Sequence, residues 1–138
     1  MYFLDTNACI AFINGEPASV RHRIEAAFGA RSELAISTVV MFELWYGVVK
    51  SPRRDFNEER LRRFQSAPIL TVPFDADDSR VAAELRVELE RVGRPISAYD
   101  LLIAAQALRR EWILVTANVR EFGRIKGLAW QDWSRGHS

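Results

Sequence analysis

Four acidic residues of this chain lie where an apolar run ends or where a helix is expected to begin. They are Asp5, Glu43, Asp100 and Glu121. A carboxylate beside core segments costs free energy unless it is paired or bound to a metal ion. Oxygen ligands without nitrogen or sulfur favour Mg²⁺ or Mn²⁺ over Zn²⁺. If the four acids meet at one edge of a sheet, they form a hard-cation site of the kind that hydrolyses phosphodiesters.

Short apolar runs alternate with helical patterns along the chain and would position these acids. We predict strands at residues 2–4, 34–36, 69–72 and 112–115, with a fifth, edge strand at 128–130. Helices are predicted at about 6–13, 17–29, 39–49, 54–66, 76–92, 97–110 and 119–122. This alternation predicts an α/β fold in which a short central parallel sheet is flanked by helices, a three-layer α/β/α arrangement. No linker or repeat divides the chain, so we expect a single domain over residues 1–138.

The predicted sheet places the acids on one side. In open α/β sheets, ligands collect at the carboxyl ends of the strands. Asp5 follows the first strand directly, and the helix that carries Glu43 starts just after the second. Glu121 lies just past the fourth strand, and Asp100 is in the first turn of a helix. All four side chains are therefore expected at the same crevice.

Helix capping offers an alternative role for three of these acids. Asp5 could simply cap the helix that follows it. Ser97 with Asp100, and Asn118 with Glu121, match the spacing of a capping box. A capped helix start can still direct a carboxylate into a cleft, so capping and function are compatible.

Glu43 is harder to explain without a function. It lies in a helix of mostly apolar residues, between Phe42 and Leu44. An ion pair within the helix would need a basic residue four positions away, and Val39 and Gly47 occupy those positions. A polar stripe facing solvent remains the alternative.

Composition excludes several other classes of protein. With 138 residues and 49% hydrophobic residues, the chain can bury a sizeable core. No window approaches the roughly 18 apolar residues of a membrane span, and no signal-peptide pattern follows Met1, so we expect a cytoplasmic protein without membrane contact. Cys9 is the only cysteine, which excludes a disulfide framework and a thiolate zinc site. His22 and His137 are too far apart in sequence to suggest a ribonuclease with paired imidazoles.

Basic residues give a weaker indication. The net charge is +1, but only Lys50 and Lys126 of the 19 basic residues are lysine. Arginine binds phosphate bidentately and stacks on bases, although a GC-rich coding bias also favours arginine. The densest cluster consists of Arg53, Arg54, Arg60, Arg62 and Arg63. It is either a track for an RNA backbone or a solvated helix face balanced by Asp55, Glu58 and Glu59.

Four segments of the chain match the motifs of a known family in order and spacing. They are Leu4-Asp5-Thr6-Asn7, Phe42-Glu43-Leu44 with Tyr46-Gly47, Asp100-Leu101-Leu102-Ile103-Ala104-Ala105, and Leu114-Val115-Thr116-Ala117-Asn118 with Arg120-Glu121-Phe122. These segments resemble the PIN-domain ribonucleases, and within them the VapC toxins of bacterial type II toxin–antitoxin systems. Gly127-Leu128 and Gln131-Asp132-Trp133 resemble the usual VapC ending. The resemblance covers essentially the whole chain.

The resemblance implies a PIN-like fold and an Mg²⁺-dependent endoribonuclease, with Mn²⁺ as a possible substitute. Metal-activated water would cleave a structured RNA such as tRNA and leave a 5′-phosphate and a 3′-hydroxyl. By motif, Asp5, Asp100 and Glu43 correspond to metal ligands. The fourth acidic position falls on Glu121 or Asn118, since many relatives have Asp there. The polar residues expected to support the ligands are Thr6, Asn7, Ser37, Thr116 and Asn118.

The resemblance also implies partners. It implies a homodimer, a cognate VapB-like antitoxin, and a higher assembly of the two. A groove for an antitoxin segment is expected on Phe42, Trp45, Tyr46 and Val49, although ordinary core packing is the alternative. An antitoxin arginine would be suited to enter the acidic pocket and displace the metal.

Two other functions compete with this interpretation. One is a catalytically silent PIN-like module that only binds or regulates, which need not bind Mg²⁺. The other is a haloacid dehalogenase-like phosphatase, which resembles Asp-x-Asp after the first strand. Asn7 stands at the second acidic position here, which argues against a phosphatase.

Overall fold

The computed structural model describes residues 1–135, and His137 lies outside them. Five parallel strands form one sheet in the order β3-β2-β1-β4-β5. The strands are β1 (Tyr2–Leu4), β2 (Leu34–Ser37), β3 (Leu70–Val72), β4 (Ile113–Val115) and β5 (Trp130–Gln131). The helices are α1 (Thr6–Asn14), α2 (Ala18–Gly29), α3 (Thr38–Lys50), α4 (Arg54–Gln65), α5 (Ala76–Arg91), α6 (Ala98–Arg110) and α7 (Val119–Phe122).

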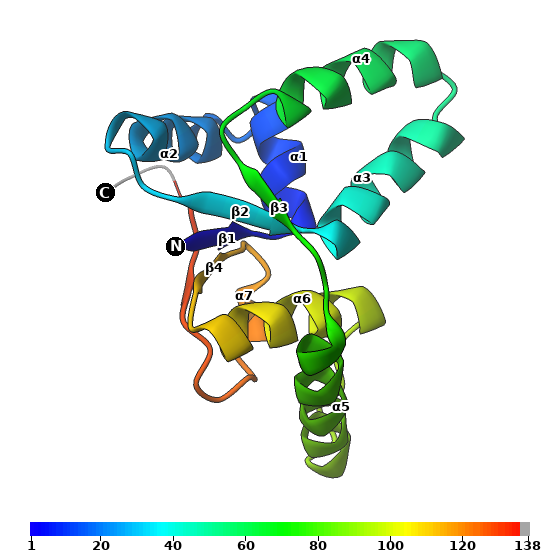
Figure 1. The fold of residues 1–138 in the computed structure, drawn as a ribbon, viewed down its shortest axis with the longest axis vertical. Helices are drawn as coiled ribbons and strands as arrows, with labels where there is room; N and C mark the ends of the chain where they lie inside the picture. The colour runs from blue at the N-terminus through cyan, green and yellow to red at the C-terminus, as the bar shows by residue number, and fades with distance from the viewer. Residues whose placement is uncertain (136–138) are drawn as a thin grey trace.

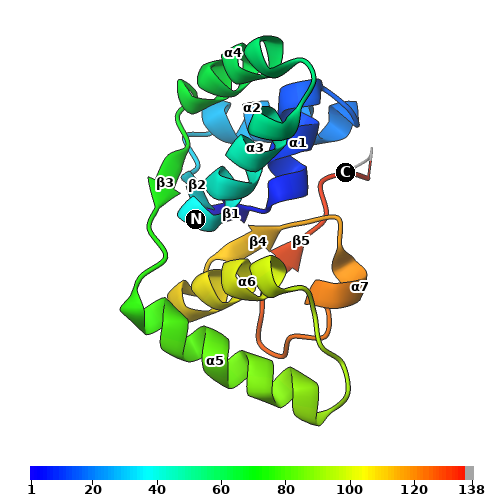
Figure 2. The same cartoon turned by 90° about the vertical axis from the view of Figure 1, so that its right-hand side faces the viewer.

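Helices cover the sheet on both faces. Figures 1 and 2 show α1 to α4 on one side and α5, α6 and α7 on the other. The central strands are largely buried between these layers, with Phe3, Ala35 and Leu114 at 0% exposure. The predicted three-layer α/β/α arrangement with a parallel sheet is therefore confirmed. Within residues 1–135, no helix is both long and apolar enough to cross a membrane.

Local signals at the helix ends explain where the elements start and stop. Asp5 and Ser37 cap α1 and α3 through their side chains, because each accepts a backbone N–H that has no partner within the helix. Gly15 ends α1 in the left-handed conformation, at φ 76°, which glycine adopts without steric cost. Most predicted bounds agree with the structure to within two residues. The predicted fifth, edge strand at 128–130 is present at the edge beside β4, but it begins two residues later, as Trp130–Gln131.

Strand order decides which segments meet at the carboxyl edge. β1 lies between β2 and β4, with Leu4 opposite Val115 in the register. Asp5, the start of α3 and the segment after β4 therefore leave the sheet side by side. β3 lies at the edge, separated from β1 by β2, and Asp75, the acid that follows it, pairs with Arg109 and Arg110 instead.

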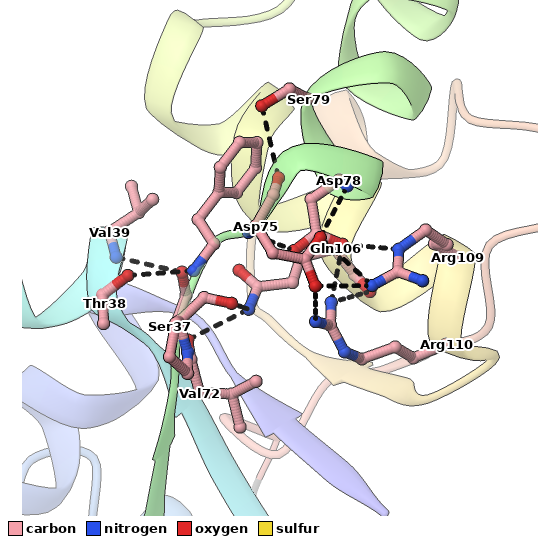
Figure 3. Close-up of polar contacts among 12 residues, drawn as sticks. Ser37, Thr38, Val39, Val72, Asp75, Asp78, Ser79, Gln106, Arg109 and Arg110 are labelled. Atoms are coloured by element: carbon pink, nitrogen blue, oxygen red, sulfur yellow. Dashed lines mark hydrogen bonds and ion pairs between the residues drawn. The ribbon is translucent and has the colours of Figure 1, made fainter.

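A polar network joins α6 to α5 and to the end of β3 (Figure 3). Asp78 is fully buried and accepts hydrogen bonds from Arg109 Nε at 2.8 Å and Arg110 Nη1 at 2.7 Å. Asp75 and Asp78 form a reciprocal capping box at the start of α5. Gln106 donates to the carbonyl oxygen of Val72 at 3.1 Å. These bonds hold α6, whose first turn carries Asp100, against the rest of the sheet.

Candidate active site

Asp5 is the most buried of the four acids. It directly follows β1, and its backbone N–H donates to the Val115 carbonyl oxygen at 3.1 Å. The residue is only 3% exposed. Its carboxylate accepts from the Ala8 N–H at 2.8 Å and from Thr116. Burial, together with the negative charges of Asp100 and Glu43, raises the pKa of Asp5 to about 6, although the two hydrogen bonds act in the opposite direction. Three carboxylates therefore share one electrostatic environment.

Glu43 reaches the same environment from α3. It is half-buried, and the Thr6 hydroxyl donates to its Oε1 at 2.5 Å. Thr6 is the first residue of α1, so this bond joins the starts of two helices that leave neighbouring strands. The alternative of a stripe facing solvent does not describe this side chain.

Asp100 and Glu121 form a second pair, connected through polar neighbours. The Ser97 hydroxyl donates to Asp100 Oδ2 at 2.9 Å, and Asn118 Nδ2 donates to Glu121 Oε2 at 3.3 Å. The backbone N–H of Ser97 donates to Glu121 Oε1 at 3.3 Å. Burial raises the pKa of Asp100, and the charge of Glu121 acts in the same direction. Asp100 also raises the pKa of Asp5, so the two pairs are coupled.

Capping does not account for Asp100 or Glu121. Neither Ser97 nor Asn118 makes a side-chain cap bond, so the two capping boxes expected from their spacing are not formed. The Ser97 N–H turns to Glu121, which is 24 residues away in the chain. Only Asp5 combines the role of helix cap with a place in the acidic group.

The four carboxylates have no cationic partner. Within residues 1–135, none of them forms an ion pair with arginine or lysine. Within that range, no three acidic, histidine or cysteine side chains lie close enough together to hold a metal ion as they stand. Like charges without a cation repel one another, so an open arrangement is expected. An all-oxygen group with uncompensated negative charge fits a hard divalent cation.

The supporting polar residues fall into two groups. Thr6, Thr116 and Asn118 bond to Glu43, Asp5 and Glu121 respectively. Ser37 is fully buried and accepts from the Val39 N–H at 2.9 Å, so it shapes the start of α3. Asn7 is exposed and lines a neighbouring cavity.

Ser97 contacts two of the acids but was not predicted among the site residues. Its hydroxyl bonds to Asp100 and its backbone N–H bonds to Glu121. The sequence signal for this contact was the spacing of three residues between Ser97 and Asp100, which was interpreted as a capping box.

The four residues of the expected partner groove lie along one stripe of α3 but differ in exposure. Phe42, Tyr46 and Val49 are each at least half exposed, and the Phe42 ring lies against Tyr46 and Tyr99. Trp45 is partly buried against the core, with the Arg62 guanidinium 5.5 Å from its ring centroid. A separate cavity of about 220 Å³ lies between α1, α3 and α4 and is bordered by Glu43.

The basic cluster on α4 is largely paired. Arg62 and Arg63 form ion pairs with Glu58 and Glu59 one turn away. Arg60 donates to the carbonyl oxygen of Ile13 and to the side chain of Asn14. These contacts favour the solvated helix face over a phosphate track.

Comparison with known proteins identifies the family. Residues 2–128 match the family model described as the PIN domain. Over 133 residues the chain is 41% identical to the tRNA(fMet)-specific endonuclease VapC of Shigella flexneri, a match that covers 96% of this chain and 98% of the relative. It is 38% identical to Ribonuclease VapC2 of Rickettsia felis, over 98% of this chain and 99% of that protein.

This chain is a PIN-domain protein of the VapC family. Solved structures agree with the assignment. The crystal structure of VapBC2 from Rickettsia felis, bound to a DNA fragment from its promoter, aligns with a TM-score of 0.88 at 38% identity, covering 96% of this chain and 98% of that chain. The DNA-bound VapBC of Salmonella typhimurium aligns with a TM-score of 0.87 at 34% identity, covering 96% and 97%. PIN nucleases generally depend on a divalent metal ion, and the carboxylates of this VapC-family chain fit one.

We expect Asp5→Asn to melt at a higher temperature than the wild type in EDTA at pH 7.5. Folding raises the pKa of Asp5 from its ordinary 3.8 to about 6, so the ionised carboxylate opposes folding once the pH exceeds both values. The gain is expected to be 1 to about 3 kcal/mol, since asparagine also caps helices well. Thermal unfolding with and without Mg²⁺ measures the change.

The pH dependence supplies the control. The wild type should lose its relative stability as the pH rises from about 4 to about 6, and the variant should not. Added Mg²⁺ should raise the melting temperature of the wild type more than that of the variant. A variant that melts lower than the wild type in EDTA at pH 7.5 would contradict the expectation.

Proposed function

We propose that this VapC-family chain is a metal-dependent endoribonuclease that acts as the toxin of a type II toxin–antitoxin system, with residues 1–138 as one domain. The observation that carries the proposal is the group of four carboxylates from four segments, without a cationic side chain among the described residues to neutralise them. The names of the relatives support the same activity. A structured RNA such as tRNA is the proposed substrate.

Asp5, Asp100 and Glu43 are the proposed metal ligands, and Glu121 assists them as the fourth acid. Mg²⁺ suits these oxygen donors, and Mn²⁺ is the proposed substitute. When bound, the ion lowers the pKa of water and offsets charge on the reacting phosphate. Asn118 donates to Glu121, which favours Glu121 over Asn118 as the residue that faces the metal.

The protein's own contribution is to hold the carboxylates in place before RNA arrives. The Ala8 N–H and Thr116 orient Asp5, and the Thr6 hydroxyl orients Glu43. Ser97 fixes both Asp100 and Glu121. Because each carboxylate already has a donor, little reorganisation is needed at the moment of reaction. Hydrolysis is proposed to leave a 5′-phosphate and a 3′-hydroxyl.

We further propose a VapB-like antitoxin as partner, a homodimer of this chain, and a higher assembly of both. The related VapBC structures are complexes, two of them with DNA. The cavity of about 220 Å³ beside Glu43 is apolar along Ile10, Ile13 and Leu44, and it suits an apolar antitoxin segment. If an arginine of that antitoxin segment reached Glu43 and the neighbouring carboxylates, it would neutralise their charge. The cytoplasm is the proposed location, since RNA and antitoxin are found there.

Cleavage of a total tRNA pool tests the proposal. Purified, antitoxin-free protein should give discrete fragments with Mg²⁺ and none with EDTA. Isothermal titration with Mg²⁺ and Mn²⁺ should show binding to the wild type and weaker binding to Asp5→Asn.

A catalytically silent PIN-like module is the alternative function. Folded protein that binds metal but cuts no RNA in the pool would favour it. Cleavage that persists in EDTA would contradict the metal-dependent mechanism.

A further inference from the structure

A second cavity lies next to the acidic group, on the other side of Thr116. Its volume is about 190 Å³. One wall is the face of α1 that carries Ala8 and Ala11, and the opposite wall is the end of β4 with Ala117. Trp133 closes it from the segment after β5, which lies beside α1 (Figure 2).

The walls of this cavity are apolar and already fixed. Val115 and Trp133 are at most 2% exposed. The Trp133 indole donates to Gln131 Oε1 at 2.8 Å and packs edge-on against Tyr2, with ring centroids 5.0 Å apart. A ligand that enters therefore meets a preformed surface, and it gains apolar burial without ordering these side chains.

Few of the lining residues are polar, and of these only Thr116 is buried. The side chains of Asn7 and Glu16 are exposed, and Ser134 is half-buried. An apolar interior with a few polar groups around it suits a flat ring that carries hydrogen-bonding groups on its edge. Unpaired RNA bases have this character, and proteins recognise them by stacking and by contacts to their edges.

The cavity shares residues with the acidic group. Thr116 lines it and bonds to Asp5, and Ala8 lines it and donates its N–H to the Asp5 carboxylate. A nucleotide whose phosphate lies at Asp5 would thus carry its base to the cavity opening. The volume is below the roughly 300 Å³ at which small-molecule pockets begin, so it accommodates one base and not a whole nucleotide.

We propose that this cavity is a subsite for one unpaired nucleobase next to the phosphate that is cleaved. The inference rests on the proposed ribonuclease function and adds the feature of the RNA that the site selects. Glu16 accepts hydrogen bonds and repels acceptors, so the subsite prefers a base edge with an amino group.

Filling the cavity tests the proposal. Ala117 is exposed at the opening, and Ala117→Leu adds bulk there without altering an acidic residue. Once the cut in the tRNA pool is mapped, a hairpin oligoribonucleotide spanning it is made with natural bases and with an abasic ribonucleotide on either side of the cut. The abasic change should lower kcat/KM of the wild type about 10- to 100-fold at one of the two positions.

The two changes should not add. Ala117→Leu should lower kcat/KM on the natural oligonucleotide to a similar extent and show no further loss on the abasic one. The same variant in an Asp100→Asn background should bind the natural oligonucleotide more weakly, as measured by fluorescence anisotropy. Ala83→Leu, the same chemical change on the exposed face of α5, is the matched control and should behave as the wild type.

Each other outcome overturns the proposal. If the losses in kcat/KM from Ala117→Leu and from the abasic substrate multiply, no base occupies the cavity. The same conclusion follows if Ala117→Leu cleaves the natural oligonucleotide as fast as the wild type. A variant that cleaves normally but loses antitoxin binding would assign the cavity to a partner side chain. Glu16→Gln, a change at an exposed side chain, must relax the preference for the base at the sensitive position, and an unchanged preference contradicts the role of Glu16. Wild-type protein that cuts no tRNA removes the ribonuclease function itself, whereas cleavage without base dependence removes only this subsite.

Discussion

Asp100→Asn is expected to lower kcat/KM for RNA cleavage at least about 1,000-fold in Mg²⁺. Asparagine has nearly the same shape, and the Ser97 hydroxyl that donates to Asp100 can still donate to it. The variant loses the negative charge that couples to Asp5 and Glu121. The expected loss is therefore one of catalysis and metal affinity, not of folding. Initial rates on a tRNA substrate, with thermal unfolding of both proteins, measure it.

Two further variants make this experiment specific. Asp77→Asn removes the same charge from an exposed position on α5 and should leave cleavage unchanged. Glu121→Gln should lose less activity than Asp100→Asn if Glu121 only assists at the metal site. An Asp100→Asn protein that cleaves RNA at the wild-type rate would show that the site is assigned to the wrong residues.

Asp78→Ala is expected to destabilise the fold by about 3 to 5 kcal/mol. The Asp78 carboxylate is fully buried and accepts from Arg109 and Arg110, and it also completes the capping box with Asp75. Its removal takes a buried partner from Arg109 and Arg110, which keep only the half-exposed Asp75, and it removes the side-chain half of a capping box. Urea unfolding at pH 7 measures the free energy of unfolding. Asp77→Ala, the exposed neighbour, should change it by less than about 0.5 kcal/mol.

Because of the Asp78 carboxyl group, the free energy of unfolding is expected to depend on pH in the acid range. Burial favours the neutral form of Asp78, but the hydrogen bonds from the Asp75 backbone, Arg109 and Arg110 outweigh it and lower its pKa below the ordinary 3.8. A lowered pKa in the folded state means that the stabilisation is present above about pH 4 and is lost as the pH falls below it. The difference between wild type and Asp78→Ala should therefore shrink below pH 4. A difference that is constant from pH 7 to pH 3 would contradict the role of this ion pair.

Much of the fold could be predicted because its signals are local. The apolar run before Asp5, the stop at Gly15 and the caps at Ser37 and Asp75 each depend on a few neighbouring residues. The bounds of the edge strand were less exact, because β5 has only two paired residues and its pairing with β4 depends on the rest of the sheet.

The roles of Ser97 and Asp78 could not be predicted, because they depend on partners that are distant in the sequence. Local spacing suggested that Ser97 caps α6, but its N–H is taken by Glu121 from another helix. No signal in the sequence indicated a role for Asp78, because its partners Arg109 and Arg110 lie more than 30 residues away in the chain. Partners at such distances are chosen by packing, not by spacing.

The sequence by itself determined that acidic residues stand at the ends of buried strands and the starts of helices, and it determined the family through the order of its motifs. Only the tertiary structure decided which atoms meet. The order β3-β2-β1-β4-β5 places β1 next to β2, so Asp5 lies beside the start of α3, which carries Glu43. The packing of α6 brings Asp100 close as well, and the negative charges of both acids raise the pKa of Asp5. Burial at that junction then raises the pKa of Asp5 to about 6, because desolvation depends on every layer packed around the carboxyl group and no short stretch of sequence specifies it.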